Sequence, residues 1–395
     1  MAALRTSNGG YLCQRIEKVR ILKVLHVYRT YYPDPPGGLQ EAIRQICLTT
    51  KKYGVENTIF ALSPRPEPKT ILREEARVVR ARSWFAPASC DIGGIEAVST
   101  FRRLVQQADL VHYMFPWPFA DVLHHASGND KPSVLTYISD VIRQRSLNTL
   151  YAPLMWQTLK SMRAVVFNAP RYATSSPVLS DSQLYDKLRQ IPLGIDEASY
   201  AKSGDDSIFD RLGFDGSSQY FLFVGVLRYY KGVQYLIEAA SSVRVPIVIA
   251  GSGPMARSLM NQASALGLSN VIFAGQVSDG EKISLIGRCT ALILPSHLRS
   301  EAYGMVLVEA AMYGRPLISC EIGTGTSYVN AHDETGFVIP PADPAALAAA
   351  MNRLLDQQGL VEKFGFAARR RYEEYFSGEV MGQAYASLFS EFAAR

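Results

Sequence analysis

Short apolar runs alternate with helical patterns along this chain of 395 residues, and that alternation limits its possible folds more than any other feature. In the first half the runs have the length of buried strands, and helical patterns such as 39–53, 95–107 and 147–162 separate several of them. The strand candidates are residues 19–28, 57–62, 77–81, 110–114, 133–137, 164–168 and 187–191. Strands that alternate with helices predict a parallel sheet covered on both faces.

The second half repeats the alternation of strand and helix candidates, with strand candidates from 220–226 to 336–339 and helices from 344 to the end. We therefore predict an α/β protein with two doubly wound, Rossmann-like domains that face one another across a cleft. The boundaries are a disordered leader at 1–18, a first domain at 19–195, a linker at 196–214, a second domain at 215–375, and a helix at 376–395 that returns to the first domain. Ligands of such folds bind in the crevice at the carboxyl ends of the strands.

Length and composition agree with a two-domain globular protein, because 395 residues exceed one ordinary core. No apolar run reaches the roughly 18 residues of a membrane helix. The first residues lack the long apolar centre of a secretory signal. Five scattered cysteines without CxxC spacing predict reduced thiols in a cytoplasmic protein rather than zinc ligands or a disulfide framework.

Charge is distributed unevenly along the chain. Residues 1–190 hold 25 Lys and Arg against 15 Asp and Glu, whereas residues 191–395 hold 16 against 21. A basic first domain is typical of a protein that contacts an anionic membrane surface or a phosphorylated lipid, although solvated surface charge explains the count equally well. No nucleic-acid-binding motif accompanies the spread-out basic residues, so we expect no nucleic-acid partner.

Two acids frame a predicted helix in the segment 295–316, P-S-H-L-R-S-E-A-Y-G-M-V-L-V-E-A-A-M-Y-G-R-P. Glu301 precedes the helical pattern of 303–313, and Glu309 lies within it. A helix N-terminus between two carboxylates has free backbone N–H groups that favour an anion. This order suits a ligand of the form sugar–diphosphate–ribose, and two solvated helix acids are the alternative.

The first strand candidate leads into the loop R-T-Y-Y-P-D-P-P-G-G and then a helix. Gly37 and Gly38 would let backbone approach a ligand without side-chain interference. The pattern is not GxGxxG, and a plain tight turn is the alternative.

Taken together, the motifs resemble those of the retaining, GT-B fold enzymes of glycosyltransferase family 4. The match consists of S-E-A-Y-G-M-V-L-V-E, which fits the E-x7-E pattern of that family, the loop of Gly37 and Gly38, and the segments V-G-V-L-R-Y-Y-K-G, I-A-G-S-G-P and E-T-G-F-V-I-P-P. It covers the chain after about residue 19. More narrowly, H-V-Y-R-T-Y-Y-P-D, F-P-W-P, P-S-H-L-R-S-E and S-C-E-I-G-T-G-T-S are similar to bacterial O-antigen mannosyl- or D-rhamnosyltransferases that use GDP-sugars.

The resemblance implies roles for particular residues in a reaction that uses neither a metal nor a cofactor. Arg228 and Lys231 are expected to stabilise the leaving diphosphate, and with Glu301 they form the predicted catalytic group. The arginine of the family pattern is replaced by Val226, and Arg228 stands two residues later, on the same face of an extended segment.

The same resemblance assigns the donor contacts. Glu309 is expected to accept hydrogen bonds from the ribose hydroxyls, and Glu301 to hold the donor sugar. The backbone N–H groups of Tyr303, Gly304 and Met305 are expected to receive the sugar hydroxyls or the phosphate.

One departure from the family pattern concerns the donor sugar. Family members commonly carry a histidine in the segment T-Y-I-S-D, where this chain has Ile138, and that histidine usually bonds the C6 hydroxyl. A site built to bond a hydroxyl rejects analogues that lack it. Ile138 offers an apolar wall instead, which favours a 6-deoxy donor such as GDP-D-rhamnose over GDP-mannose. A core role for Ile138 is the alternative.

Several other residues follow strand ends near the expected cleft. His112 and Asp140 are candidates for the acceptor site, with a buried core histidine as the alternative for His112. His297 and Arg299 are candidates for contact with the donor phosphate or base, and residues 323–327 for a backbone-led binding loop.

These observations predict a hexosyltransferase that moves an α-linked D-rhamnose or D-mannose from a GDP-sugar onto a lipid-diphosphate-linked saccharide in O-antigen synthesis. Its expected place is the cytoplasmic face of the inner membrane. A related sugar–nucleotide epimerase and an inactive scaffold subunit are the alternatives.

Overall fold

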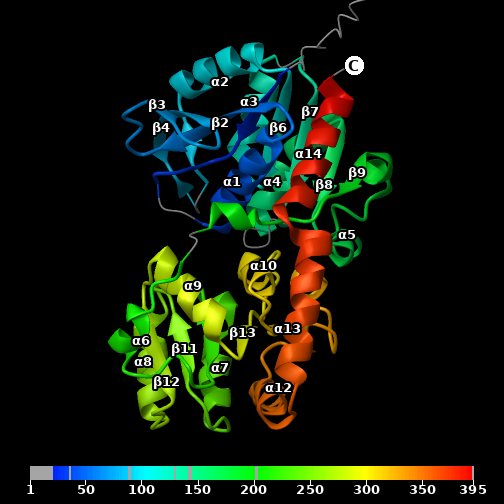
Figure 1. The fold of residues 1–395 in the computed structure, drawn as a ribbon. Coiled ribbons are helices and arrows are strands. Elements are labelled where there is room, and N and C mark those ends of the chain that lie inside the picture. The colour runs from blue at the N-terminus through cyan, green and yellow to red at the C-terminus, as the bar shows by residue number, and fades with distance from the viewer. Residues whose placement is uncertain are drawn as a thin grey trace, which may run out of the picture.

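The computed structural model describes residues 21–34, 37–87, 90–128, 130–140, 145–200 and 203–393, without the side chains of 145–150. The expected leader at 1–18 lies outside the described residues. Figure 1 shows two α/β domains, the first half of the chain in one and most of the second half in the other. Cys47, Cys90, Cys289 and Cys320 are free thiols.

The first domain is built on a sheet with the strand order β3-β4-β2-β1-β6-β7-β8-β9, and β5 pairs with β4. β3 and β5 run antiparallel to β4, and the other pairs are parallel. The strands are β1 (Leu22–Val27), β2 (Val55–Ser63), β3 (Thr70–Leu72), β4 (Arg77–Phe85), β5 (Ile92–Gly93), β6 (Leu110–Phe115), β7 (Ser133–Tyr137), β8 (Ala164–Phe167) and β9 (Leu188–Gln190). The helices are α1 (Gly38–Lys51), α2 (Ile95–Gln107), α3 (Pro118–Ala126), α4 (Arg145–Ser161), α5 (Pro170–Ser175) and η2 (Ser182–Lys187).

The second domain has an entirely parallel sheet in the order β12-β11-β10-β13-β14-β15. Its strands are β10 (Phe221–Val224), β11 (Ile247–Ala250), β12 (Val271–Gly275), β13 (Ala291–Leu294), β14 (Leu317–Cys320) and β15 (Gly336–Ile339). Its helices are α6 (Ser207–Leu212), η4 (Tyr229–Lys231), α7 (Val233–Ala240), α8 (Ala256–Ala265), α9 (Asp279–Arg288), α10 (Met305–Met312), α11 (Thr326–Val329), α12 (Pro344–Asp356) and α13 (Leu360–Arg371).

Central strands are apolar on both faces because helices cover both sides of each sheet. Every residue of β6, β13 and β14 is buried. Helix starts follow local rules, and α9 begins with a capping box in which Ser278 and Glu281 satisfy each other's backbone N–H groups.

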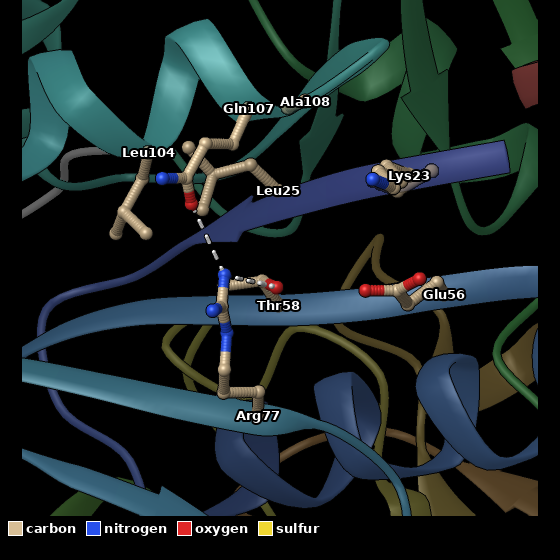
Figure 2. A pocket seen from close by; sticks show the side chains of 9 residues that line it. Lys23, Leu25, Glu56, Thr58, Arg77, Leu104, Gln107 and Ala108 are labelled. Carbon is tan, nitrogen blue, oxygen red and sulfur yellow. Dashed lines mark hydrogen bonds between the residues drawn. The ribbon is translucent and has the colours of Figure 1, made fainter.

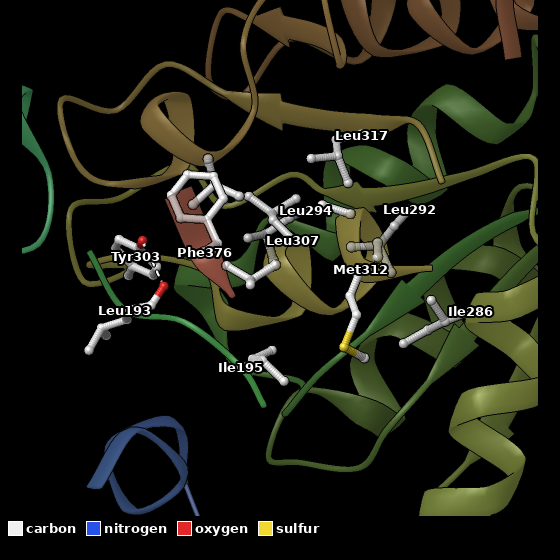
Figure 3. Packing of buried hydrophobic residues seen from close by; sticks show 14 of the residues in the cluster. Leu193, Ile195, Ile286, Leu292, Leu294, Tyr303, Leu307, Met312, Leu317 and Phe376 are labelled. Atoms are coloured by element: carbon white, nitrogen blue, oxygen red, sulfur yellow. Dashed lines mark hydrogen bonds between the residues drawn. The ribbon is translucent and has the colours of Figure 1, made fainter. Parts of the chain in front are cut away.

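Two segments cross between the domains side by side. Residues 191–200, which include η3 (Glu197–Ser199), lead out of the first domain, and η5 (Tyr372–Phe376) with α14 (Gly378–Ala393) leads back. The Ile195 backbone N–H donates to the Phe376 carbonyl at 2.9 Å, and the Gly378 N–H donates to the Ile195 carbonyl at 2.7 Å. Figure 3 shows Leu193, Ile195 and Phe376 beside the apolar residues of α10.

The last helix, α14, packs against the first domain. A Cβ on Gly382 would lie 2.6 Å from the Cβ of Thr49 in α1, so the two helices touch at backbone distance. The Tyr385 hydroxyl lies 3.0 Å from the Thr136 hydroxyl of β7. The chain therefore ends on the domain in which it began (Figure 1).

The structure refines several sequence-based boundaries. The expected linker at 196–214 contains η3 and α6, and Phe209 of α6 packs in a T-shaped arrangement against Phe214 and Tyr220 of the second domain. The helix expected at 303–313 begins only at Met305, because Gly304 adopts a left-handed φ of 85°. Within the described ranges, no helix is both long and apolar enough to span a bilayer.

Candidate active site

The candidate site lies where the loops after β10 and β13 meet at the carboxyl edge of the second sheet. The two strands are parallel neighbours, so their following loops emerge side by side. Gly232, with φ of 72°, comes so near the loop after β13 that a Cβ on it would lie 2.0 Å from the Pro295 carbonyl oxygen. A residue without a side chain is required for this approach, which brings Lys231 next to the segment of Glu301.

Lys231 and Glu301 form a buried ion pair. The Lys231 ammonium donates to Oε2 of Glu301, and their side chains are 13% and 11% exposed. The Ser296 hydroxyl donates to the same oxygen at 3.2 Å. Burial, the largest single effect, lowers the pKa of Lys231, but the Glu301 carboxylate and Tyr230 together offset it and raise the pKa, so the lysine is a cation at neutral pH.

Arg228 adds a second cation beside this pair. Its side chain is exposed and makes no hydrogen bond or ion pair with another residue that the structure describes. Its charge opposes the protonation of Lys231, which shows that the two cations lie close together. The three predicted catalytic residues are therefore assembled at one place.

The predicted donor-binding residues that follow Glu301 have different surroundings from one another. Gly304 is the N-cap of α10, and Met305 opens the helix with its N–H at the free end. Tyr303 is buried, and its hydroxyl donates to the Leu193 carbonyl at 3.0 Å, as the dashed line in Figure 3 shows. The Tyr303 side chain thus anchors α10 to the crossing segment, and only its backbone remains for a donor contact.

Glu309, about one turn into α10, also binds a lysine. Its Oε1 accepts from the Tyr200 hydroxyl at 2.6 Å and from the Lys282 ammonium at 3.1 Å. Burial, the largest single effect, lowers the pKa of Lys282, but Glu309 together with Asp279 and Glu41 offsets it, and the net shift of the pKa is upward. Burial, reinforced by Glu309, raises the pKa of Tyr200 well above its ordinary value. Sequence reasoning missed Lys282 and Tyr200, which lie in α9 and the crossing segment with no motif to mark them.

In each of the two carboxylates, one oxygen accepts hydrogen bonds from neighbouring side chains and the other is open. Oε1 of Glu301 and Oε2 of Glu309 have no hydrogen-bond partner within the described ranges, although the carboxylates are only 11% and 10% exposed. A carboxylate that is fixed on one oxygen presents the second as an oriented acceptor.

The start of α1 faces this second acid. Gly37 and Gly38 are exposed, and a Cβ on Gly38 would meet nothing within 4 Å, whereas one on Gly37 would lie 2.9 Å from Oε1 of Gln40. Glu41, in the first turn of the same helix, contributes to the raised pKa of Lys282. Glu41 is therefore near enough to Lys282 for its charge to act on that lysine.

Asp140 joins the two domains. It accepts from Arg299 at 3.1 Å, from the Tyr137 hydroxyl at 3.0 Å and from the Ser176 hydroxyl at 2.5 Å. Arg299 also donates to the Gly323 carbonyl at 2.8 Å. Asp140 and Arg299 are thus bound to each other across the cleft, two residues from Ile138 and Glu301 respectively.

Two predicted site residues are buried in the first domain. His112 has no exposed area, and its ring bonds His26 at 3.0 Å and the Thr136 hydroxyl at 2.7 Å. It is the buried core histidine that the sequence left open, and its position gives it no route to an acceptor. Ile138, at the carboxyl end of β7, is 6% exposed and belongs to the apolar core.

Three polar side chains around Glu301 have buried atoms without a partner among the described residues. These atoms are both ring nitrogens of His297, the hydroxyl of Thr324 and the hydroxyl of Ser327. The His297 ring lies between Tyr229 and Tyr235, and burial lowers its pKa, so it is neutral at pH 7. The loop of Thr324 is tied to the Glu301 segment by a bond from the Gly325 N–H to the Ala302 carbonyl at 2.9 Å. Buried polar atoms are rarely left unpaired, so this clustering favours a polar ligand.

The two facing Rossmann-like domains define a GT-B fold. The family model described as Glycosyltransferase Family 4 matches residues 36–199, and the model described as Glycosyl transferases group 1 matches residues 204–371. The chain belongs to glycosyltransferase family 4.

Two curated relatives match nearly the whole chain. It is 43% identical to the D-rhamnosyltransferase WbpZ of Pseudomonas aeruginosa over 90% of this chain and 92% of the relative. It is 39% identical to the O-antigen chain mannosyltransferase C of Escherichia coli over 93% and 98%. Among solved structures, the sucrose-phosphate synthase of Thermosynechococcus elongatus shares the fold with a TM-score of 0.77 at 20% identity, over 95% of this chain and 100% of that one.

Proposed function

We propose that this glycosyltransferase moves an α-linked D-rhamnose or D-mannose from a GDP-sugar onto a lipid-diphosphate-linked saccharide, with retention. The observation that carries the proposal is the pair of carboxylates that each use only one oxygen, Glu301 before the start of α10 and Glu309 within it. Their open oxygens suit a sugar at one end and a ribose at the other, with the helix N-terminus and two cations available for the diphosphate between them.

In the proposed reaction, Arg228 and Lys231 stabilise the charge that develops on the leaving diphosphate. Both are cations beside the N-terminus of α10, and preorganised charge of this kind needs no reorganisation during the reaction. Glu301 fixes the sugar hydroxyls through Oε1 while Lys231 and Ser296 hold Oε2. The unpartnered nitrogens of His297 and the hydroxyl of Thr324 supply further hydrogen bonds to the donor.

Glu309 takes the ribose hydroxyls on Oε2 in this proposal. Tyr200 and Lys282 hold Oε1 and keep the carboxylate oriented. Gly37 and Gly38 face the same group and allow close backbone approach to the diphosphate or sugar.

The donor sugar is proposed to be the 6-deoxy one. Ile138 closes the carboxyl end of β7 with an apolar side chain that offers no partner to a C6 hydroxyl. A named relative with 43% identity is a D-rhamnosyltransferase, and one with 39% identity is a mannosyltransferase, so both donors belong in the test.

The acceptor and the location of the reaction at a membrane surface are also part of the proposal. A saccharide carried on a lipid diphosphate is held at a membrane surface, and the basic first half of the chain suits contact with anionic lipid at the cytoplasmic face. Asp140 is the polar side chain at the acceptor side, two residues after Ile138.

The test is a donor panel. The purified protein is incubated with GDP-D-rhamnose or GDP-mannose and a lipid-diphosphate-linked saccharide, and the product's anomeric configuration is read by NMR. We expect an α-linked product and faster turnover with GDP-D-rhamnose. A β-linked product, or no transfer from either donor to any such acceptor, would refute the proposal, and faster turnover with GDP-mannose would refute the role given to Ile138.

A further inference from the structure

A second polar cavity lies at the opposite edge of the first sheet from the cleft. It has a volume of about 550 Å³ and is lined at the amino ends of β7, β8 and β9 and at the last turns of α3, α4 and α14. In Figure 1 this edge lies at the end of the molecule marked by the C-terminus, away from the second domain. The cavity therefore belongs to neither the donor site nor the domain interface.

The lining of this cavity is strongly basic. Lys131, Lys160, Arg163 and Lys187 lie around it, with Asp130 as the acid among the lining residues that the structure describes. His124 also lines it but is neutral, because burial lowers its pKa to about 4. Four cations around one hollow repel one another unless an anion lies between them.

Part of this charge has a structural use. Lys160 lies in the last turn of α4, where a cation complements the helix dipole, and the Lys187 ammonium donates to the Lys160 carbonyl. Those contacts do not involve the guanidinium of Arg163, which makes no hydrogen bond or ion pair to a described side chain. Burial and the nearby Arg163 charge together lower the pKa of Lys187, so the like charges are close and not neutralised.

A neighbouring cavity at the same edge of the sheet has a less basic lining. The cavity in Figure 2 has a volume of about 150 Å³, and its cations Lys23 and Arg77 are accompanied by Glu56. Lys23 is the register partner of Glu56 on the adjacent strand, and Arg77 donates to the Thr58 hydroxyl and to Gln107. Among the lining residues, cations therefore outnumber acids by one in this cavity and by three in the other.

We propose that the cavity lined by Lys131, Lys160, Arg163 and Lys187 binds a phosphate group carried by a polar molecule, at a site separate from the donor cleft. Arginine forms bidentate bonds with phosphate oxygens, and lysines supply point charges around them. The volume exceeds that of a phosphate ion, so the ligand is a phosphorylated small molecule or the head group of an anionic lipid. Both sources share the phosphate chemistry.

The first arm of the test measures a soluble phosphate. Inorganic pyrophosphate is titrated calorimetrically into protein saturated with GDP, so that the donor site is already filled. We expect binding to the wild type, and Arg163→Gln with Lys187→Gln to weaken it by about tenfold or more. The matched control, Lys23→Gln with Arg77→Gln, removes two cations from the neighbouring cavity and is expected to leave the affinity within about twofold.

The second arm measures a lipid head group. The same three proteins are sedimented with phosphatidylcholine vesicles that contain or lack phosphatidylglycerol, at one salt concentration. Loss of binding in the Arg163/Lys187 variant alone, in either arm, supports the site and identifies its ligand source. Equal loss of binding in both variants, or no binding in either arm, would overturn the proposed phosphate site. The cavity would then carry only ordinary surface charge.

Folding of the variants is checked independently. Circular dichroism spectra and Tm are compared for all proteins, and Arg163→Lys with Lys187→Arg, which keeps both charges, is expected to retain binding. Transfer activity in solution is expected to be unchanged in the Arg163→Gln/Lys187→Gln variant, because neither residue lies at the cleft. Full binding by that variant would itself refute the proposal.

Discussion

The ion pair of Lys231 and Glu301 allows a test that separates stability from catalysis. Both side chains are nearly nine-tenths buried, and removal of one partner leaves the other charge uncompensated. Loss of one partner from a fully buried pair costs about 3–5 kcal/mol, and some water reaches this site, so we expect about 2–3 kcal/mol for Glu301→Gln or Lys231→Met. At roughly 2–4 °C per kcal/mol, each variant should lower the Tm of the second domain by roughly 4–12 °C.

The double variant, Lys231→Met with Glu301→Gln, should recover most of that loss. It buries no unpaired charge, and replacing a buried pair with neutral groups of similar size is often close to neutral. Transfer activity should nevertheless be abolished in all three variants, because the proposed reaction uses both side chains.

The assay is thermal unfolding followed by circular dichroism without nucleotide, together with turnover of the GDP-sugar. If the Tm losses of the single variants simply add in the double variant, the two charges are not coupled and the reasoning fails. Activity near that of the wild type in Glu301→Gln would remove this acid from the catalytic group. A control variant, Arg244→Gln, breaks an exposed ion pair and should change the Tm very little.

Three further predictions follow from particular contacts. Glu309→Gln should raise KM for the GDP-sugar by about tenfold or more, since hydrogen bonds to a charged group contribute about 1.5–3 kcal/mol; it should also lower Tm, because the buried Lys282 cation loses its partner, and unchanged KM would contradict its role at the ribose. Ile138→His should shift the ratio of kcat/KM towards GDP-mannose relative to Ile138→Leu, and equal ratios would make Ile138 a core residue only. Burial raises the pKa of Asp121 to about 7, so its contribution to stability is complete below about pH 4 and is lost as the pH rises to about 7. The wild type should therefore lose Tm relative to Asp121→Asn between pH 5 and pH 8, and parallel Tm curves would contradict this.

Much of the fold follows from local pattern. The limits predicted for α2 and β7 agree with the structure, because each is bounded by residues that end its periodicity. β3 and β5 were missed because strands of three and two residues at a sheet edge bury no apolar face. The start of α10 was placed two residues early, because only the left-handed backbone of Gly304 shows where the helix begins.

The site was predictable where a motif stays within one segment and not where it needs tertiary contacts. Glu301 and Glu309 were found because the spacing of the two acids is itself the signal. Lys282 and Tyr200 come from elements far away in the sequence, and only the packing of α9 and the crossing segment brings them to Glu309. His112 was expected at a strand end but is the third residue of β6, and nothing in its own segment indicates that Phe389 of α14 packs against its ring.

The positions of these contacts separate donor binding from domain movement. Lys231, Glu301, Lys282 and Glu309 all belong to the second domain, so opening of the cleft leaves both ion pairs intact. The bond from Arg299 to Asp140 joins the two domains and must break when they separate. Arg299 lies two residues before Glu301 and is also held by the Gly323 carbonyl, within the second domain. The proposed donor-binding acids and the lysines that hold them thus lie in one domain, and the bond of Arg299 to Asp140 is a contact with the first domain that separation would break.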